Sequence, residues 1–271
     1  MGLFNLSRQL VHDREKVEAG FPKRPCINEE TSMRGNNSSV VQTRADRRLL
    51  DRPPWSALTT THSRFALGDG LARRYRPDVA PMAALREDSP ECLQALHGLM
   101  QGGDVVGLFS SEPVAASGNL KLIAHKGLEQ MIYEGGKPPP AGHEYEALTP
   151  DDVPEMMQLA KLTQPGPFAV RTIELGGYIG IRSGGQLVAM AGERMRFDGF
   201  TEISAVCTHP DHRGRGHASA LVRVLMRNIL DRGETPFLHI FSDNARAGAL
   251  YRQLGFSHRR SLTVTILKRP D

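Results

Sequence analysis

The sequence has little of what marks a secreted, membrane-spanning or metal-binding protein. Its 271 residues include three cysteines, Cys26, Cys92 and Cys207, and no CxxC pair. This excludes a disulfide framework and a cysteine zinc site, and it favours a reducing cytoplasm. No apolar run approaches the roughly 20 residues that span a bilayer, and no signal-peptide pattern opens the chain. We therefore expect a cytoplasmic protein with no membrane partner and no bound metal.

A strong excess of one charge is also absent. Lysine and arginine number 34 against 30 aspartates and glutamates, which gives a formal net charge of +4 at pH 7. Because no lysine-rich tail or aromatic-basic repeat accompanies this mild excess, the composition does not favour a nucleic-acid partner. A basic N-terminal extension that binds nucleic acid is the weakest alternative, whereas a small anionic ligand suits the charge. The 39% hydrophobic and 24% charged content is typical of a globular protein.

Composition divides the chain into parts. Residues 1–45 are rich in turn formers and charges without a sustained period, which predicts a flexible extension. Residues 46–140 contain strand-like runs, a helix capped by Ser89 and a buried strand at 104–111. The Gly- and Pro-rich stretch 134–143 predicts a linker to a second unit.

Residues 141–271 form that second unit, in which strands and helices alternate. Apolar residues with a period of two mark the strands, and a period near 3.6 marks the helices. Strand-helix-strand units in mixed order predict a mixed α/β sheet. The elements are expected, in order, at 144–163 (a short strand and a capped helix), 178–197 (a hairpin), 200–210, 217–233, 236–241, 243–256 and 261–269.

The stretch HPDHRGRGHASALV, residues 209–222, places two Arg-Gly pairs at the start of a predicted helix. A helix N-terminus has unsatisfied N–H groups and a partial positive charge, so it can hold a phosphate. Gly214 and Gly216 would leave those amides uncovered, and Arg213 and Arg215 would add charge. The stretch therefore predicts a pyrophosphate cradle.

Three alternatives compete with the cradle. The glycines could form a flexible loop that binds nothing. The stretch also resembles the start of a dinucleotide fingerprint, but Ser219 replaces its third glycine and several strands precede it. An arginine pair that binds DNA phosphates would need a helix-turn-helix pattern, which the sequence lacks.

Two motifs resemble the GCN5-related N-acetyltransferase (GNAT) family. Arg213-x-x-Gly216-x-Ala218 matches its acyl-CoA signature, R/Q-x-x-G-x-G/A. The run at 244–256, Asn-x-x-Ala-x-x-Leu-Tyr-x-x-x-Gly-Phe, is similar to the closing helix and strand of that family, and the two motifs stand in the expected order. The resemblance covers roughly residues 144–269.

The resemblance implies a fold and a function. The fold would be a mixed, mostly antiparallel central sheet with flanking helices. Residues 46–140 look like the N-terminal part of the FR47-like and glycine-N-acyltransferase-like branch, a degenerate GNAT-like domain, and residues 141–271 would be the catalytic domain. The chain would transfer an acetyl group from acetyl-CoA directly to a primary amine of a small molecule or peptide, as a monomer or homodimer. The alternative is a protein that binds acyl-CoA without turnover, as a sensor or structural module.

The resemblance also implies which residues hold the coenzyme. A splayed, bulged strand would use the backbone of Val206, Cys207 and Thr208 along the pantetheine arm. Asn244 would hydrogen-bond the same arm, although it could serve only as a helix N-cap. The cradle itself would consist of Arg213, Gly214, Arg215, Gly216, His217 and Ala218.

Two residues are implied as catalytic. Glu202, eleven residues before Arg213, stands where the histone-acetylating branch carries its base. On a strand beside an apolar cleft its pKa would be raised, although a solvated surface role is the alternative, and Glu193 is the substitute base. Tyr251 would give its proton to the departing thiolate. Cys207 has no activating base nearby, so we expect a packed thiol rather than a nucleophile.

Overall fold

The computed structural model describes residues 46–117, 119–140 and 142–271. The flexible extension predicted for residues 1–45 lies outside the described residues. The strands, in chain order, are β1 (Ala66–Leu67), β2 (Ala72–Tyr75), β3 (Met82–Leu85), β4 (Val105–Ser110), β5 (Lys121–Ile132), β6 (Glu146–Ala147), β7 (Tyr178–Ser183), β8 (Gln186–Phe197), β9 (Phe200–Thr208), β10 (Thr235–Phe241) and β11 (Ser257–Lys268).

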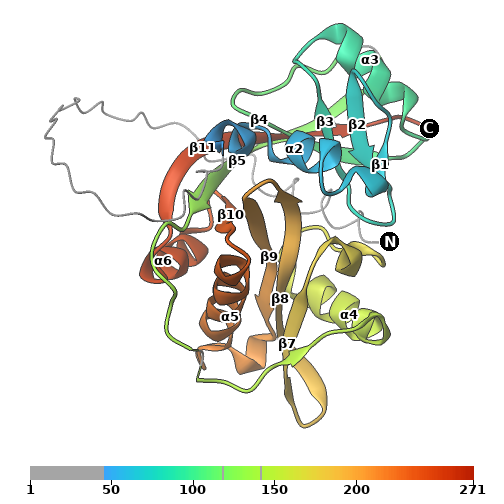
Figure 1. Cartoon of the computed structure of the whole chain (residues 1–271). Coiled ribbons are helices and arrows are strands. Elements are labelled where there is room, and N and C mark those ends of the chain that lie inside the picture. The colour runs from blue at the N-terminus through green and yellow to red at the C-terminus, as the bar shows by residue number, and fades with distance from the viewer. Residues whose placement is uncertain (1–45, 118, 141) are drawn as a thin grey trace, which may run out of the picture.

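These strands form one sheet in the order β1-β2-β3-β4-β11-β5-β10-β9-β8-β7-β6. Among the described neighbours, β3–β4 and β9–β10 are parallel and the others are antiparallel. Helices flank the sheet (Figure 1). The predicted class, a mixed α/β fold with a mostly antiparallel sheet and flanking helices, is therefore confirmed.

The helices begin where the sequence places capping residues. The Ser89 side chain accepts a hydrogen bond from the Cys92 N–H at 3.2 Å, and Thr149 and Asp152 form a reciprocal capping box. None of the described helices is long and apolar enough to cross a lipid bilayer. The α-helices are α2 (Pro53–Thr59), α3 (Pro90–Gly98), α4 (Val153–Thr163), α5 (His217–Asp231) and α6 (Ala245–Gln253), and short 3-10 turns lie at Arg47–Asp51, Ser63–Phe65, Pro150–Asp152, Thr172–Leu175 and Pro210–His212.

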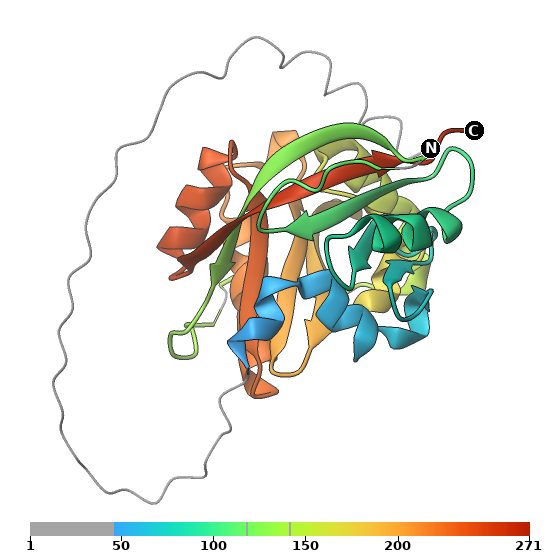
Figure 2. The same cartoon turned by 90° about the horizontal axis from the view of Figure 1, so that it is seen from above.

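Strand β5 joins the two halves of the chain into one sheet. It belongs to the N-terminal half but lies between β10 and β11, antiparallel to both, and β11 also pairs with β4. Figure 2 shows β5 and β11 as long ribbons side by side. Exposed polar side chains interrupt the apolar alternation at 121–132, and pairing with two strands that are distant in sequence makes this segment a strand. Residues 46–140 and 141–271 therefore share one sheet, and their division into two domains stays a prediction.

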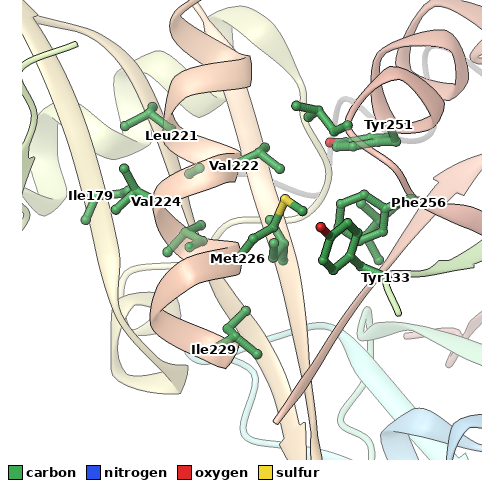
Figure 3. Close-up of a cluster of buried hydrophobic side chains, with 14 of the residues drawn as sticks. Tyr133, Ile179, Leu221, Val222, Val224, Met226, Ile229, Tyr251 and Phe256 are labelled. Carbon is green, nitrogen blue, oxygen red and sulfur yellow. The ribbon is translucent and has the colours of Figure 1, made fainter. Parts of the chain in front are cut away.

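Helix α5 turns its apolar face toward the sheet. Ala218 of that face is only half-buried, because it lies in the first turn of the helix. In Figure 3, Val222 and Met226 of α5 lie on the side that faces Tyr251 and Phe256, and Val224 lies beside Ile179. The rest of the face is almost completely buried: Leu221, Val222, Leu225 and Ile229. This packing fixes the start of α5 beside the end of β9.

Candidate active site

Strand β9 separates from β10 in the middle of the sheet. Their parallel pairing covers only Phe200 to Glu202 on β9. Further along, Ala205 has a φ of +53°, and the register against β8 shifts between Ser204 and Cys207, so that two residues of β9 face one of β8. A bulge of this kind leaves N–H groups without a strand partner. The expected splayed, bulged strand is confirmed.

The first turn of α5 is open. Gly216 is its N-cap residue with a φ of +80°, Gly214 has a φ of +78°, and no side chain of the described residues caps the helix. Positive φ favours glycine, which adds a conformational reason for both residues. A Cβ at Gly214 would meet no atom within 4 Å. The space beside these amides is therefore free for a ligand.

Two arginines flank this turn without a carboxylate partner among the described residues. Arg213 Nε and Arg215 Nη2 contact only the carbonyl oxygens of Thr208 and Asp211, each at 3.4 Å. Their charges add to the partial positive charge of the helix N-terminus. The region is thus suited to an anion with several oxygens, such as a diphosphate.

A pocket of about 450 Å³ runs past this turn. Arg215 is absent from its described lining residues. Arg246, in the first turn of α6, is a basic lining residue that the sequence motifs do not single out. A charge two residues after Asn244 is the signal that could have found it. The implied coenzyme residues that do line the pocket are Val206, Cys207, Thr208, Arg213, Gly214, Gly216, His217, Ala218 and Asn244.

A second pocket, of about 210 Å³, lies along residues 203–206 of β9. Both halves of the chain line it, and most of its lining side chains are apolar, including Met82, Val106, Phe109, Leu128, Ile203 and Val264. Six residues line both pockets: Gln164, Pro165, Val206, Asn244, Ala247 and Tyr251. They therefore meet where the bulged strand faces α6.

Tyr251 stands at this junction. Its ring packs edge-on against Phe256, with centroids 5.9 Å apart, and 7% of its surface remains exposed. Its hydroxyl makes no hydrogen bond to another described residue, so the group is free for a ligand. Burial, and then the neighbouring Cys207 thiol, raises the pKa of Tyr251 well above its usual range. The phenol therefore stays protonated at neutral pH and can donate a hydrogen bond.

The surroundings of Glu202 show that two expectations were wrong: its pKa is not raised, and its side chain is not solvated at the surface. The side chain is fully buried, and its carboxylate accepts hydrogen bonds from Arg194 Nε and Nη2 at 2.7 and 2.6 Å and contacts His239 Nδ1 at 2.7 Å. Burial alone would raise its pKa, but the Arg194 charge and these hydrogen bonds lower the pKa to about 2. A carboxylate held in this way is a weak proton acceptor.

The other candidates occupy structural positions. Glu193, the substitute base, pairs with Arg232 at 2.9 Å and is absent from the lining of both pockets. Burial raises the pKa of the Cys207 thiol to about 11, which agrees with a packed role. The Asn244 Oδ1 accepts a hydrogen bond from the Ala247 N–H at 3.1 Å, so Asn244 is an N-cap. Its amide nitrogen remains available at the junction of the pockets.

Comparisons with known proteins agree with this geometry. The FR47-like protein family matches residues 178–264. A crystal structure from Novosphingobium aromaticivorans, assigned to the GNAT acetyltransferase family, is 41% identical, covers 82% of this chain and 99% of that one, and gives a TM-score of 0.77. A GCN5-related N-acetyltransferase from Kribbella flavida, 18% identical over 80% of this chain and 94% of that one, shares the fold with a TM-score of 0.55.

A curated relative matches about a third of the chain. N-alpha-acetyltransferase RimI of Mycobacterium tuberculosis is 42% identical over 101 residues, which make up 34% of this chain and 61% of that protein. The match thus spans less than two thirds of the relative's length.

Proposed function

This chain belongs to the GNAT family of acetyltransferases, and from that premise we propose that it transfers an acetyl group from acetyl-CoA directly to a primary amine. One observation carries the proposal: two pockets meet at Val206, Asn244 and Tyr251. Direct transfer requires that both substrates reach one point in the right orientation. The larger pocket suits the coenzyme and the apolar one suits the acceptor.

The residues of the larger pocket fit coenzyme A. The uncapped amides at the start of α5, together with Arg213 and Arg246, would hold its phosphates. The Val206 N–H, at the bulge, would donate a hydrogen bond to the thioester carbonyl and so stabilise the negative charge that develops there. The Asn244 amide would bind the pantetheine arm. When bound, the coenzyme supplies the activated acetyl group.

Tyr251 would act on the departing sulfur. Its protonated hydroxyl donates a hydrogen bond that stabilises the charge on the sulfur as the carbon–sulfur bond breaks. The amine loses one proton as its nitrogen bonds to the acetyl carbon, and the departing thiolate gains one proton to become the thiol. Tyr251 lies between these two sites and can relay the proton.

The acceptor pocket favours an amine that is already unprotonated. No carboxylate side chain is among its described lining residues, and Glu202 is ion-paired behind it. An α-amine has a pKa of about 7.7–8.0, whereas a lysine amine has one of about 10.4. An α-amine therefore needs no strong base near neutral pH. Together with the likeness to a protein named N-alpha-acetyltransferase, this supports an N-terminal α-amine as acceptor.

The test is release of free thiol from acetyl-CoA with three acceptor sets. These are peptides with a free N-terminus, N-blocked peptides with one lysine, and small polyamines. The proposal expects turnover with the first set, with kcat/KM rising as the α-amine loses its proton near pH 8. Turnover with the lysine peptides alone would refute the α-amine assignment. Coenzyme binding without thiol release in any set would instead support an acyl-CoA sensor.

The N-terminal half would shape the acceptor site. Met82, Val106 and Phe109 provide one wall of the apolar pocket, so residues 46–140 contribute to acceptor choice even though the cradle lies in 141–271. A cytoplasmic location and a monomeric or homodimeric state stay predictions.

A further inference from the structure

Among the described residues that line the acceptor pocket, Arg194 of β8 has the one permanently charged side chain. Its Nε and Nη2 are both bound to the Glu202 carboxylate. No described residue accepts a hydrogen bond from Nη1, and 12% of the side chain remains exposed. Nη1 is therefore the donor that Arg194 keeps for a ligand in this cavity.

A chain of buried hydrogen bonds holds this arginine in place. Because Arg259 has only donors, Gln130 turns its Oε1 to Arg259 Nη1 at 2.8 Å. The Gln130 Nε2 then donates to the Leu50 carbonyl at 2.8 Å and to His239 Nε2 at 3.1 Å. His239 is left with a proton on Nδ1, which it donates to Glu202 at 2.7 Å.

This series of hydrogen bonds crosses five strands of the sheet. Gln130 lies on β5, His239 on β10, Glu202 on β9, Arg194 on β8 and Arg259 on β11. Gln130, His239 and Glu202 each have hydrogen-bond partners for their side-chain donors and acceptors, so the guanidinium of Arg194 has little freedom to turn. Glu202 is buried and ionised and does not line the pocket. Its role in this series is to orient Arg194, not to act as a base.

We propose that Arg194 selects the acceptor by donating a hydrogen bond from Nη1 to a neutral carbonyl oxygen beside the acceptor's amine, and that Glu202 is the positioning residue that holds Arg194. This inference rests on the proposed function and names the group that the acceptor pocket recognises. An amide carbonyl of a peptide N-terminus has this chemistry, and the apolar walls suit a hydrophobic first side chain.

The charge balance favours a neutral carbonyl over a carboxylate. Arg194 and Glu202 carry opposite charges in direct contact. No other described lining residue of this pocket is an aspartate, glutamate, lysine or arginine. A carboxylate would therefore add an uncompensated charge to a largely enclosed apolar cavity, which is unfavourable. A carbonyl oxygen accepts the same hydrogen bond without that penalty.

The first arm of the test uses the unchanged protein and thiol release from acetyl-CoA. The acceptors are leucinamide and leucylglycinamide, which carry neutral carbonyls, leucine, which carries a carboxylate, and 3-methylbutylamine, which carries neither. Rates are expressed per unprotonated amine, because these amines differ in pKa. We expect kcat/KM to be about tenfold to a hundredfold higher for at least one amide than for 3-methylbutylamine, the effect of one charged hydrogen bond. Leucine should be no better than 3-methylbutylamine.

The second arm removes the donor without leaving a buried charge. Arg194→Met is combined with Glu202→Gln, whose amide oxygen still accepts from His239 Nδ1. We expect this double variant to lose the preference for the amide while keeping its affinity for coenzyme A. The matched control is Arg196→Met with Glu234→Gln. These two residues also form an ion pair, with its arginine on β8, but neither of them lines the pocket. This control should keep the wild-type preference.

The outcomes separate this inference from the function on which it rests. Equal kcat/KM values for 3-methylbutylamine and the amides would overturn the role of Arg194 and leave the proposed function standing. A preference for the amides that is undiminished in the double variant would do the same. A preference for leucine over both amides overturns the neutral carbonyl. Absence of thiol release with every amine overturns the proposed function and this inference with it. Loss of preference in the double variant but not in the control supports it.

Discussion

Replacing Gly216 with aspartate should weaken coenzyme binding while leaving the protein folded. A Cβ at Gly216 would lie 3.5 Å from His143 Cε1, which is an ordinary contact. The φ of +80° disfavours a side chain by roughly 1–2 kcal/mol. A carboxylate at the start of a helix stabilises the folded state by roughly 0.3–1 kcal/mol, because it interacts with the partial positive charge there. The net loss of stability should therefore be about 1 kcal/mol.

The effect on coenzyme binding should be larger than this change in stability. Two like charges about 4 Å apart repel by about 1 kcal/mol in water and about 4 kcal/mol near a protein surface. Because Gly216 is exposed, screening favours the lower part of that range, roughly 1–2 kcal/mol, or about fivefold to thirtyfold in Kd.

Titration calorimetry with coenzyme A, together with denaturant unfolding, measures both quantities. Gly216→Asn has the same shape without the charge, so its loss of affinity should be smaller, and the difference between the two variants should shrink as salt is raised. A folded Gly216→Asp protein that binds coenzyme A with the wild-type Kd would refute the assignment of the cradle. Equal losses in both variants would show that bulk, not charge, weakens binding.

Three further predictions concern Tyr251, the ion pair of Glu202 with Arg194, and Cys207. Tyr251→Phe should lower kcat about a hundredfold with little change in the Kd of coenzyme A, because one donor to the departing sulfur is lost; equal losses in both, measured by steady-state kinetics and calorimetry, would indicate a structural tyrosine. The folded-state pKa of Glu202, about 2 against a usual 4.5, should contribute about 3 kcal/mol of stability above pH 4.5 that is lost as the pH falls toward 2. The Arg194→Met, Glu202→Gln double variant should therefore show a flatter fall in unfolding free energy between pH 6 and 3, and an unchanged slope would contradict the ion pair. Cys207→Ala should keep kcat within about threefold, because the buried thiol has a pKa of about 11 and is not a nucleophile at neutral pH; a dead but folded variant would restore the thiol as a catalytic candidate.

The family resemblance gave the wrong chemical role for Glu202. Its position relative to Arg213 matches the register of a known base. In this chain the neighbouring strand supplies Arg194, and the ion pair removes the basicity that the role needs. The same carboxylate is better placed to orient a positive charge than to accept a proton.

The sequence by itself determined the features whose causes lie within a few residues. The glycine-containing turn before α5, the caps of α3 and α4 and the hairpin at 178–197 all follow from turn chemistry and short periodicities. These local signals were sufficient for the α/β class and for predicting a cradle at the start of α5.

Only the tertiary structure decided which residues line the apolar pocket. Strand β5 enters the sheet between two strands that follow it by more than a hundred residues, and it brings Gln130 to His239. Burial and charge at Glu202 depend on side chains from β8 and β10, the latter 37 residues away. A pKa is set by the groups that surround a side chain in space, so neither periodicity nor motif spacing could reveal it.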